Sequence, residues 1–506
     1  MNDSVLNMND QIELLSVPLP EDVLKHKWHG DFAAMERIID RRLGSEIEDV
    51  MRRRLLLEKR IMKKLPRNYP YTMEQAVQLF QDAVHDFQPE EMQELMDSDY
   101  ADWIYINGVP HFRNNVVANV LKTRPDYAAR RKVQPQEAIE ENRCLHEILE
   151  EMEEKGGVSR TIRQRARLWL EEDAGVEPGE IVKVWLPVPG VDAQIKAVRI
   201  LDDGTGNISS EALQTLHIAG EDAAQRTIYW EVKWQPGMEF TVEYEFDIEA
   251  GYIDLWQGIP MDSREARTVE AEIALEAEAA TQAGCEALDR IRAWKETYAC
   301  YDPVTEDDLA EQQPHITFST MMKELTAQVV GDEIRPLEKA RRIYNYVTTK
   351  IHYSYMRSYA TLPIIPEYVV SGHKGDCGAQ ALVFITMCRI AGIPARWQSG
   401  HYSNPVRVGS HDWSRFYIEE YGWLYADVSF GGGGNRSGNE KQRRFYFGNL
   451  DPFRMCSCRR FQTNFDPAIV ELRSDPYDAQ SGEVELVGEK HYRYPYDSET
   501  IMTDYR

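Results

Sequence analysis

The 506-residue sequence predicts an α+β protein of several domains, with a helical N-terminal region, a small antiparallel β-domain and a C-terminal α+β core. Three observations predict this class. Apolar residues recur at helical spacing through the first third of the chain. Polar and apolar residues alternate along several short stretches after Pro178. After residue 375 comes a nearly all-apolar helical segment, and strand-like stretches follow it in the sequence. The expected boundaries are 1–172, 173–258, a helical linker 259–315, a core 316–470 and a tail 471–506.

Three helical stretches define the N-terminal region. Residues 32–65 carry apolar residues at helical spacing among alternating charges. Residues 72–88 begin with a Thr–x–x–Gln pair in the style of a capping box. Residues 159–175, SRTIRQRARLWLEEDAG, are expected to form another helix that ends at a glycine. Between them the aromatic stretch 99–112 contains an Asn–Gly pair that favours a tight reversal.

The β-domain is predicted from alternating, β-branched stretches that turn residues separate. The stretches are EIVKVWLPVPG, QIKAVRIL, RTIYWEVKW and EFTVEYEFDIEAGYIDLW. The alanine- and glutamate-rich residues 263–298 then predict a long helix. The tail is polar and contains one expected strand, GEVELVG. Four consecutive glycines, Gly431 to Gly434, suggest a mobile loop.

Composition excludes several classes of function. A formal net charge of −26 repels nucleic acid and anionic lipid, so neither is expected as the main partner. Seven irregularly spaced cysteines predict no disulfide framework and a reducing compartment. The N-terminus lacks the pattern of a signal peptide and no window has 18 apolar residues, so we expect a cytoplasmic protein.

No metal or cofactor is predicted. Cys456 and Cys458 are separated by one residue and have no second pair, which does not fit a zinc site. The C-terminal aspartates form no ordered calcium loop. The glycine run lacks the Gly-Lys-Ser/Thr end of a phosphate-binding loop. The oligomeric state is not predicted.

Cys377 lies at the start of the expected buried helix, in GDCGAQALVFITMCRIAGIPARW. Residues 379–391 are apolar on most faces, and Gly392 and Pro394 end the helix. Free N–H groups at a helix N-terminus favour a thiolate and can bind an oxyanion. This segment alone fits equally a thiol that only packs in the core. Cys388, inside the helix, is interpreted as a packing residue.

His411 and Asp427 are the candidate partners of the cysteine. They fall on the two arms of an expected hairpin, GSHDWSRFYIEEYGWLYADVSF. A reversal centred on Glu419 and Glu420 pairs residue 427 with residue 412, and a bulge at Gly422 would correct the register toward His411. A base and the carboxylate that orients it need this proximity. The alternative is a surface histidine and an aspartate at a strand end.

The combined motifs resemble the core of the transglutaminase-like superfamily. That family has Gly-x-Cys at a helix start, then Gly-Ile-Pro-x-Arg, His-x-Trp, and Gly-Trp followed by an aspartate. In this sequence the four motifs stand at residues 375–377, 392–396, 411–413 and 422–427. The resemblance covers roughly residues 335–430 and implies a papain-like active site. The preceding β-domain is similar to domains that accompany bacterial members.

The resemblance implies a role for each of the three residues. Cys377 would be the nucleophile, His411 the base and acid, and Asp427 the residue that orients the histidine. The Cys377 N–H would be one oxyanion donor, with Tyr353 or Tyr355 as candidates for the second, unless both tyrosines only pack. The other candidate substrate contacts are Trp397, Gln398, Tyr402 and Trp413, for which packing roles are equally open.

The implied function is cysteine-dependent hydrolysis of an amide bond in a peptide or protein through a thioester. Two alternatives remain open at this point. Attack of an amine on the same thioester would give transglutaminase-type acyl transfer. A non-catalytic member of the family, or a scaffold built on the N-terminal helices, would bind a protein partner instead.

Overall fold

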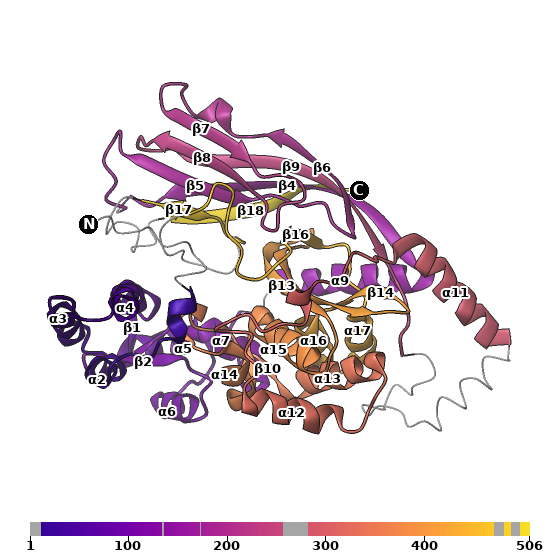
Figure 1. Ribbon diagram of the computed structural model, residues 1–506, viewed down its shortest axis with the longest axis horizontal. Helices are drawn as coiled ribbons and strands as arrows, with labels where there is room; N and C mark the ends of the chain where they lie inside the picture. The colour runs from indigo at the N-terminus through magenta and orange to yellow at the C-terminus, as the bar shows by residue number, and fades with distance from the viewer. Residues whose placement is uncertain (1–11, 134–135, 173, 257–281, 470–479, 487–495) are drawn as a thin grey trace.

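The computed structural model describes residues 12–133, 136–172, 174–256, 282–469, 480–486 and 496–506. Within them the chain is an α+β protein, as the sequence predicts. Two antiparallel sheets lie above a mixed helix–sheet core, and the N-terminal helices pack at one end of that core (Figure 1). The C-terminal strand returns to the upper layer, so the end of the chain lies in the β-layer.

The N-terminal region is helical up to residue 155. Its helices are α2 (Glu21–His29), α3 (Phe32–Leu43), α4 (Asp49–Asn68), α5 (Met73–Ala83), α6 (Pro89–Asp97), α7 (Val116–Thr123), α8 (Pro125–Ala129) and α9 (Gln136–Lys155). The expected helix over 32–65 is therefore divided into α3 and α4. The expected cap at Thr72 is confirmed, because its hydroxyl accepts from Gln75 N and the Gln75 side chain accepts from Thr72 N.

The aromatic stretch forms a hairpin rather than a simple turn. Strands β2 (Trp103–Ile106) and β3 (Val109–Phe112) pair through Asn107 and Gly108, whose φ angles are 51° and 76°. Both angles are positive, which the Asn–Gly pair tolerates. Strand β1 (Tyr71–Thr72) completes this small sheet on the other side of β3.

The helix expected over 159–175 is wrong. The segment is strand β4 (Gly157–Leu170), which pairs with β9 and β18. Its buried side chains at 158, 162, 164, 166 and 168 show a period of two, with Arg163, Arg165 and Arg167 on the other face. The buried polar Gln164 interrupts the apolar alternation, and this hid the strand in the sequence.

The β-layer consists of two four-stranded antiparallel sheets, β18-β4-β9-β6 and β17-β5-β8-β7. Their apolar side chains belong to one continuous core. The expected strand in the tail is confirmed as β17, whereas β18 was not expected. The remaining strands are β5 (Ile181–Pro187), β6 (Ile195–Asp202), β7 (Leu213–Ile218), β8 (Thr227–Lys233), β9 (Glu239–Gly251), β17 (Glu483–Glu485) and β18 (Tyr496–Tyr505).

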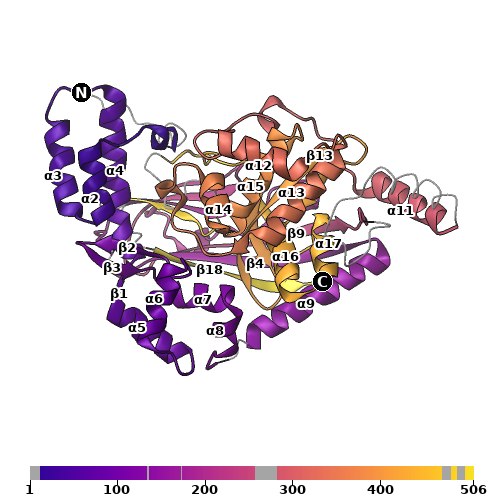
Figure 2. The ribbon, with the colours of Figure 1, turned by 90° about the horizontal axis from the view of Figure 1, so that it is seen from below.

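The expected linker helix is observed in its second half, as α11 (Gln282–Tyr298). Residues 257–281, which include the first half of that prediction, lie outside the described residues. Helix α11 extends from the side of the molecule opposite the N-terminal helices (Figures 1 and 2).

The core contains a five-stranded antiparallel sheet in the order β15-β14-β13-β12-β16, with helix α15 packed on β12 and β13. The helices are α12 (Thr320–Val330), α13 (Pro336–Lys350), α14 (Ile365–Gly372), α15 (Cys377–Ile390), α16 (Val428–Ser437) and α17 (Glu440–Phe445). The strands are β10 (His352–Tyr353), β11 (Lys374–Gly375), β12 (Ala395–Ser403), β13 (Val408–Ile418), β14 (Gly422–Ala426), β15 (Phe447–Gly448) and β16 (Arg454–Cys458).

The four glycines expected to form a mobile loop lie inside helix α16, so that prediction is wrong. Tertiary packing explains the glycines. A Cβ on Gly431 would lie 1.9 Å from the Tyr344 hydroxyl, and one on Gly434 would lie 2.7 Å from the backbone nitrogen of Arg443. Close packing against α13 and α17 therefore outweighs the low helix propensity of glycine.

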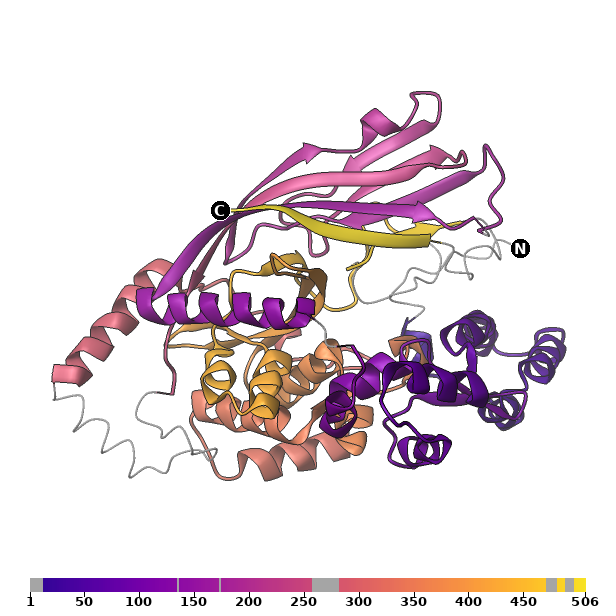
Figure 3. The ribbon, with the colours of Figure 1, turned by 180° about the vertical axis from the view of Figure 1, so that it is seen from behind.

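Helix α9 connects the layers of the molecule. It runs below the β-layer and beside α16 and α17 (Figure 3). The ring of His146 is 3.2 Å from Gln442 Oε1, and Asn404 donates to the carbonyl of Glu141 over 3.1 Å. The N-terminal region is thus attached to the face of the core that carries residues 404 and 442. Within the described residues, no helix is both long and apolar enough to cross a membrane.

Candidate active site

Cys377 is the first residue of helix α15, as the sequence predicts. Asp376 caps the helix, since its Oδ1 accepts from Ala379 N over 3.0 Å and also from the Tyr359 hydroxyl. Residues 378–389 are all buried, and Gly392, with φ at +80°, follows the helix end. A helix packed on all sides holds its first residue in a fixed position.

His411 and Asp427 form a close pair. His411 Nε2 lies 2.7 Å from Asp427 Oδ2, and both side chains are almost completely buried. The structure pairs Ser414 with Ala426, one residue away from the expected register and without a bulge. Asp427, the next residue, therefore falls opposite Trp413, on the face of β13 that also carries His411. This register brings the two side chains together without the correction that the sequence seemed to require.

Asp427 is fixed by two further interactions. Its Oδ1 accepts from Phe430 N over 2.9 Å and so caps helix α16. Its Oδ2 accepts from Arg454 Nη2 over 3.0 Å, and Arg454 also pairs with Asp451. Burial raises the pKa of Asp427, but His411 and Arg454 outweigh burial and hold that pKa below its usual range. Asp427 is therefore an ionised carboxylate at neutral pH.

Burial also governs the histidine. It lowers the pKa of His411, although the neighbouring Asp427 carboxylate raises it in part. The ring is neutral at pH 7, and the hydrogen bond to Asp427 places its proton on Nε2. Nδ1 makes no hydrogen bond with any residue that the structure describes, and His411 borders a cavity. The remaining lone pair is thus free to accept a proton.

The thiol of Cys377 is hydrogen-bonded to Asp412 Oδ2 over 3.2 Å, rather than to His411. Burial raises the pKa of the Cys377 thiol well above its ordinary value, and the charge of Asp412 raises it further. Burial and Asp412 therefore oppose the thiolate that the helix N-terminus would favour. Asp412 is itself held by Gln480, whose amide donates to its Oδ1 over 2.6 Å.

Cys377 and His411 border one cavity of about 590 Å³. Its wall comes from both ends of the sequence: α7 and α9 of the N-terminal region face β10, β13 and α16 of the core. Besides these two residues, the wall includes Lys122, Arg131, Glu137, Glu141, Tyr353, Tyr355, Tyr402, Arg407, Phe430 and Arg436. The N-terminal helices thus close one side of the space in front of the thiol.

The two candidate oxyanion tyrosines both lie in this cavity wall. Tyr353 and Tyr355 meet edge to face, with ring centroids 5.5 Å apart. Burial raises the pKa of Tyr353 well above its ordinary value, and a negative charge on Cys377 would raise it further, so its hydroxyl keeps its proton. The Tyr355 backbone N–H donates to Asn119 of α7 over 2.9 Å, which fixes this segment against the N-terminal region.

The other candidate substrate contacts differ in whether they line this cavity. Tyr402 lines the cavity, whereas Trp397, Gln398 and Trp413 do not belong to its described wall. Trp413 lies behind His411 with ring centroids 6.0 Å apart, and its Nε1 donates to Gln398 Oε1 over 2.8 Å. These two residues therefore support the histidine from the core.

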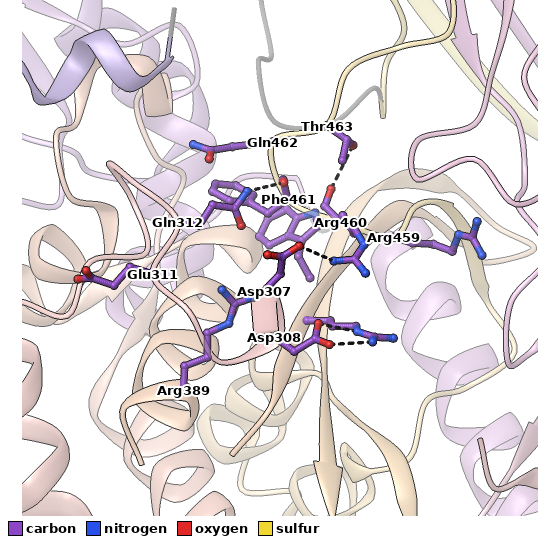
Figure 4. Close-up of a pocket in the computed structure, with 12 residues that line it drawn as sticks. Asp307, Asp308, Glu311, Gln312, Arg389, Arg459, Arg460, Phe461, Gln462 and Thr463 are labelled. Carbon is purple, nitrogen blue, oxygen red and sulfur yellow. Dashed lines mark hydrogen bonds and ion pairs between the residues drawn. The ribbon is translucent and has the colours of Figure 1, made fainter. Parts of the chain in front are cut away.

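Trp397 lies on the other face of the sheet. It lines a separate cavity of about 290 Å³, shown in Figure 4. Two ion pairs lie there: Arg396 binds both oxygens of Asp308, and Arg460 lies 3.7 Å from Asp307. Trp397 also reaches the start of α15, because a Cβ on Gly378 would lie 2.7 Å from its ring. We therefore interpret Trp397 as a packing residue.

The sequence prediction missed Asp412, Arg454 and the basic residues of the N-terminal wall. Strand alternation could have pointed to Asp412. Phe416 of β13 packs against Phe384 of α15, so even-numbered residues of β13 face the cysteine helix. Arg454 and Lys122 have no such signal, because they approach the site from segments distant in the sequence. Within the described residues no group of three or more His, Cys, Asp or Glu could hold a metal ion.

Residues 323–428 match the model of the Transglutaminase-like superfamily, a range that contains Cys377, His411 and Asp427. The chain contains a transglutaminase-like domain. This domain lies C-terminal to the β-domain, and its matched range covers α13, α14, α15 and the β12–β14 sheet.

Comparisons beyond the transglutaminase-like domain are weaker. An uncharacterized protein of Haemophilus influenzae is 27% identical over 141 residues, which covers 22% of this chain and 37% of that protein. The chain therefore spans little more than a third of that relative. A proposed cysteine protease from Cytophaga hutchinsonii is 11% identical, covering 69% of this chain and 89% of its own, with a TM-score of 0.34. The periplasmic domain of TgpA from Pseudomonas aeruginosa is 12% identical, covering 55% and 98%, with a TM-score of 0.26.

Proposed function

We propose that this protein is a cysteine-dependent hydrolase of amide bonds in peptides or proteins, with Cys377 as the nucleophile. One observation carries the proposal. The His411–Asp427 pair, at 2.7 Å, leaves Nδ1 of a neutral imidazole beside a cavity that also contains the Cys377 thiol. A neutral base with an oriented tautomer next to a thiol is what nucleophilic catalysis requires.

The reaction would proceed through a thioester. His411 Nδ1 takes the proton of the thiol while Sγ attacks the carbonyl carbon of the substrate amide. The C–N bond then breaks, and the imidazolium returns the proton to the departing amine. Water, deprotonated by the same histidine, hydrolyses the thioester and restores the thiol. Because the resting thiol is protonated, the histidine must act as a base at the moment of attack.

The negative charge of the tetrahedral intermediate would be bound at the start of α15. The Cys377 backbone N–H belongs to the first turn of the helix, where N–H groups have no partner within the helix. The hydroxyl of Tyr353, which keeps its proton, is the candidate second donor. Asp427 would hold the imidazole in place and stabilise its protonated form.

The proposal is tested by the fate of a glutamine-containing peptide. The peptide is incubated with the protein, with and without methylamine, and the products are weighed by mass spectrometry. Hydrolysis of the backbone or of the side-chain amide supports the proposal. Incorporation of methylamine instead would assign acyl transfer, the alternative outcome of the same thioester. Cys377→Ser, His411→Ala and Asp427→Asn are expected to lose most of the activity.

Cys388→Ala provides the matched control, because Cys388 lies in the same helix but fully inside the core. Activity that disappears in Cys388→Ala and persists in Cys377→Ser would refute the assignment. An unchanged peptide, together with no selective alkylation of Cys377, would favour a protein that binds a partner without catalysis. A cytoplasmic location is part of the proposal, and the six described cysteines make no disulfide.

A further inference from the structure

The charges in the cavity in front of Cys377 differ from those of the chain as a whole. The protein carries a formal net charge of −26. The cavity wall nevertheless contains four cations, Lys122, Arg131, Arg407 and Arg436, against two carboxylates on α9. One of these carboxylates, Glu141, already pairs with Arg407 at 3.4 Å. The described wall of this cavity therefore carries more positive than negative side chains, although the protein as a whole is acidic.

Lys122, near the end of α7, makes no ion pair with any residue that the structure describes, although the charge of Glu141 acts on it from a distance. Its Nζ lies 3.8 Å from the centroid of the Tyr353 ring and 5.1 Å from that of Tyr355, and it has no carboxylate partner. Although its side chain is open to the cavity, the surrounding protein lowers the pKa of Lys122 to about 8, an effect that Arg436 reinforces and a thiolate on Cys377 would oppose. The two tyrosines orient the ammonium toward the space beside the thiol.

Arg436 approaches the same space from α16, on the core side. Across the described part of the chain its guanidinium makes no hydrogen bond and no ion pair. Tyr353 and Arg436 are close enough to affect each other electrostatically, as are Arg436 and Lys122. Two cations from opposite walls therefore border the same cavity, and neither forms an ion pair with a described residue.

We propose that Lys122 and Arg436 bind a carboxylate of the substrate, so that the acyl donor is a peptide with a free acidic group close to the amide that Cys377 attacks. This inference rests on the proposed function. A low-dielectric cleft strengthens the attraction between its cations and an incoming anion. An arginine also matches the planar geometry of a carboxylate. A peptide carboxylate also lies within a few bonds of an amide, the bond that Cys377 is proposed to attack.

The first test compares two thiol reagents of similar size that differ in charge. Iodoacetate and iodoacetamide alkylate the same sulfur by the same displacement of iodide, but only iodoacetate carries a carboxylate. The rate at Cys377 is measured for each by peptide mapping at pH 7.0, where Lys122 is still mostly protonated. Because Asp412 also repels an anion, the decisive quantity is the change in the iodoacetate-to-iodoacetamide ratio between the wild type and the variants.

Removal of either cation should lower this ratio. We expect a drop of about threefold to tenfold in Lys122→Gln and in Arg436→Gln, the size of one partly screened charge interaction. Lys122→Arg should keep the ratio of the wild type. Lys155→Gln is the matched control, because it removes one positive charge from the exposed end of α9. Equal ratios in Lys122→Gln, Arg436→Gln and Lys155→Gln would overturn the inference.

The second test identifies the source of the carboxylate. Triglycine, triglycine amide and N-acetyl-Gly-Glu-Gly amide are compared for their ability to protect Cys377 from iodoacetamide. Protection by triglycine alone assigns a chain end, and protection by the glutamate peptide assigns an acidic side chain. If none protects, or if only inorganic phosphate does, the carboxylate assignment is overturned while the proposed function stands. If Cys377 reacts with neither reagent, the proposed function fails and this inference fails with it.

Discussion

Replacing Asp412 by asparagine should lower the pKa of the Cys377 thiol and make it more reactive at neutral pH. The Asp412 carboxylate accepts the hydrogen bond of the thiol over 3.2 Å, so its charge opposes formation of the thiolate. Asparagine has nearly the same shape. Its Oδ1 can still accept from Gln480, and its Nδ2 can donate to the sulfur. The substitution therefore removes the charge and little else.

The magnitude follows from the distance. Two unit charges at 3.2 Å interact by about 5 kcal/mol at an effective dielectric constant of about 20. This is an upper limit, because Gln480 already stabilises the carboxylate and water can enter the cavity. A net change of about 2 kcal/mol corresponds to roughly 1.5 pKa units. Below the pKa, the thiolate fraction should then rise about 30-fold.

The assay is the rate of alkylation of Cys377 by iodoacetamide between pH 5 and pH 10, with the modified cysteine mapped by mass spectrometry. The midpoint of the rate profile should move to lower pH in Asp412→Asn. Asp307→Asn is the control, because that carboxylate is 84% exposed and lines the other cavity. A midpoint that stays in place or moves to higher pH, or an equal shift in the control, would refute the reasoning.

Three further predictions concern the stability of the site, each measured as the free energy of unfolding in urea. Gly378→Ala should lose about 2 kcal/mol, because a Cβ there would lie between 2.6 and 2.7 Å from atoms of three side chains. Arg454→Met should lose about 3 to 5 kcal/mol, because it leaves the buried carboxylates Asp427 and Asp451 without their cation. For His401, burial lowers the pKa to about 4. The unfolded chain binds this proton at about pH 6.5, so stability should fall as pH decreases from about 6.5 to about 4, by about 1.4 kcal/mol per pH unit. His401→Gln should flatten that slope by the same amount.

Each of these predictions has a control and a contradicting outcome. Gly372→Ala should leave stability unchanged, since its Cβ would have no neighbour within 3.4 Å, and equal losses at both glycines would contradict the packing argument. Arg454→Lys keeps a positive charge and should lose less than Arg454→Met, so equal losses would mean that the charge is unimportant. An unchanged pH slope in His401→Gln would show that the histidine is not neutral in the folded protein.

Local patterns in the sequence were sufficient to predict the helix and the strands that carry the candidate site. Helix α15 was predicted with its start at Cys377, because a run of apolar residues that ends at Gly392 and Pro394 specifies a buried helix without reference to the rest of the chain. The β12 strand and the β13–β14 hairpin were predicted from alternation, which also depends only on neighbouring residues. The elements that failed are those in which tertiary contacts outweigh local preference.

Two of the failures show this plainly. Strand β4 buries the polar Gln164, whose amide donates to Ser403 in the core and accepts from Tyr244. A polar residue therefore occupies a position at which the alternation of a half-buried strand would have an apolar residue. Helix α16 contains four glycines because Tyr344 of another helix leaves no room for a side chain at Gly431. In both cases the partner lies 80 or more residues away, and no local pattern specifies it.

The sequence by itself determined the transglutaminase-like domain, the fold class and the three residues proposed for catalysis, because each is specified by residue types at short, fixed spacing. Only the tertiary structure decided what surrounds them. In the folded protein Asp412 accepts a hydrogen bond from the thiol, α7 and α9 form one wall of the cavity, and Lys122 and Arg436 border that same cavity. The physical reason is distance: charge and burial act through space, and residues 122 and 436 become neighbours only when the chain is folded.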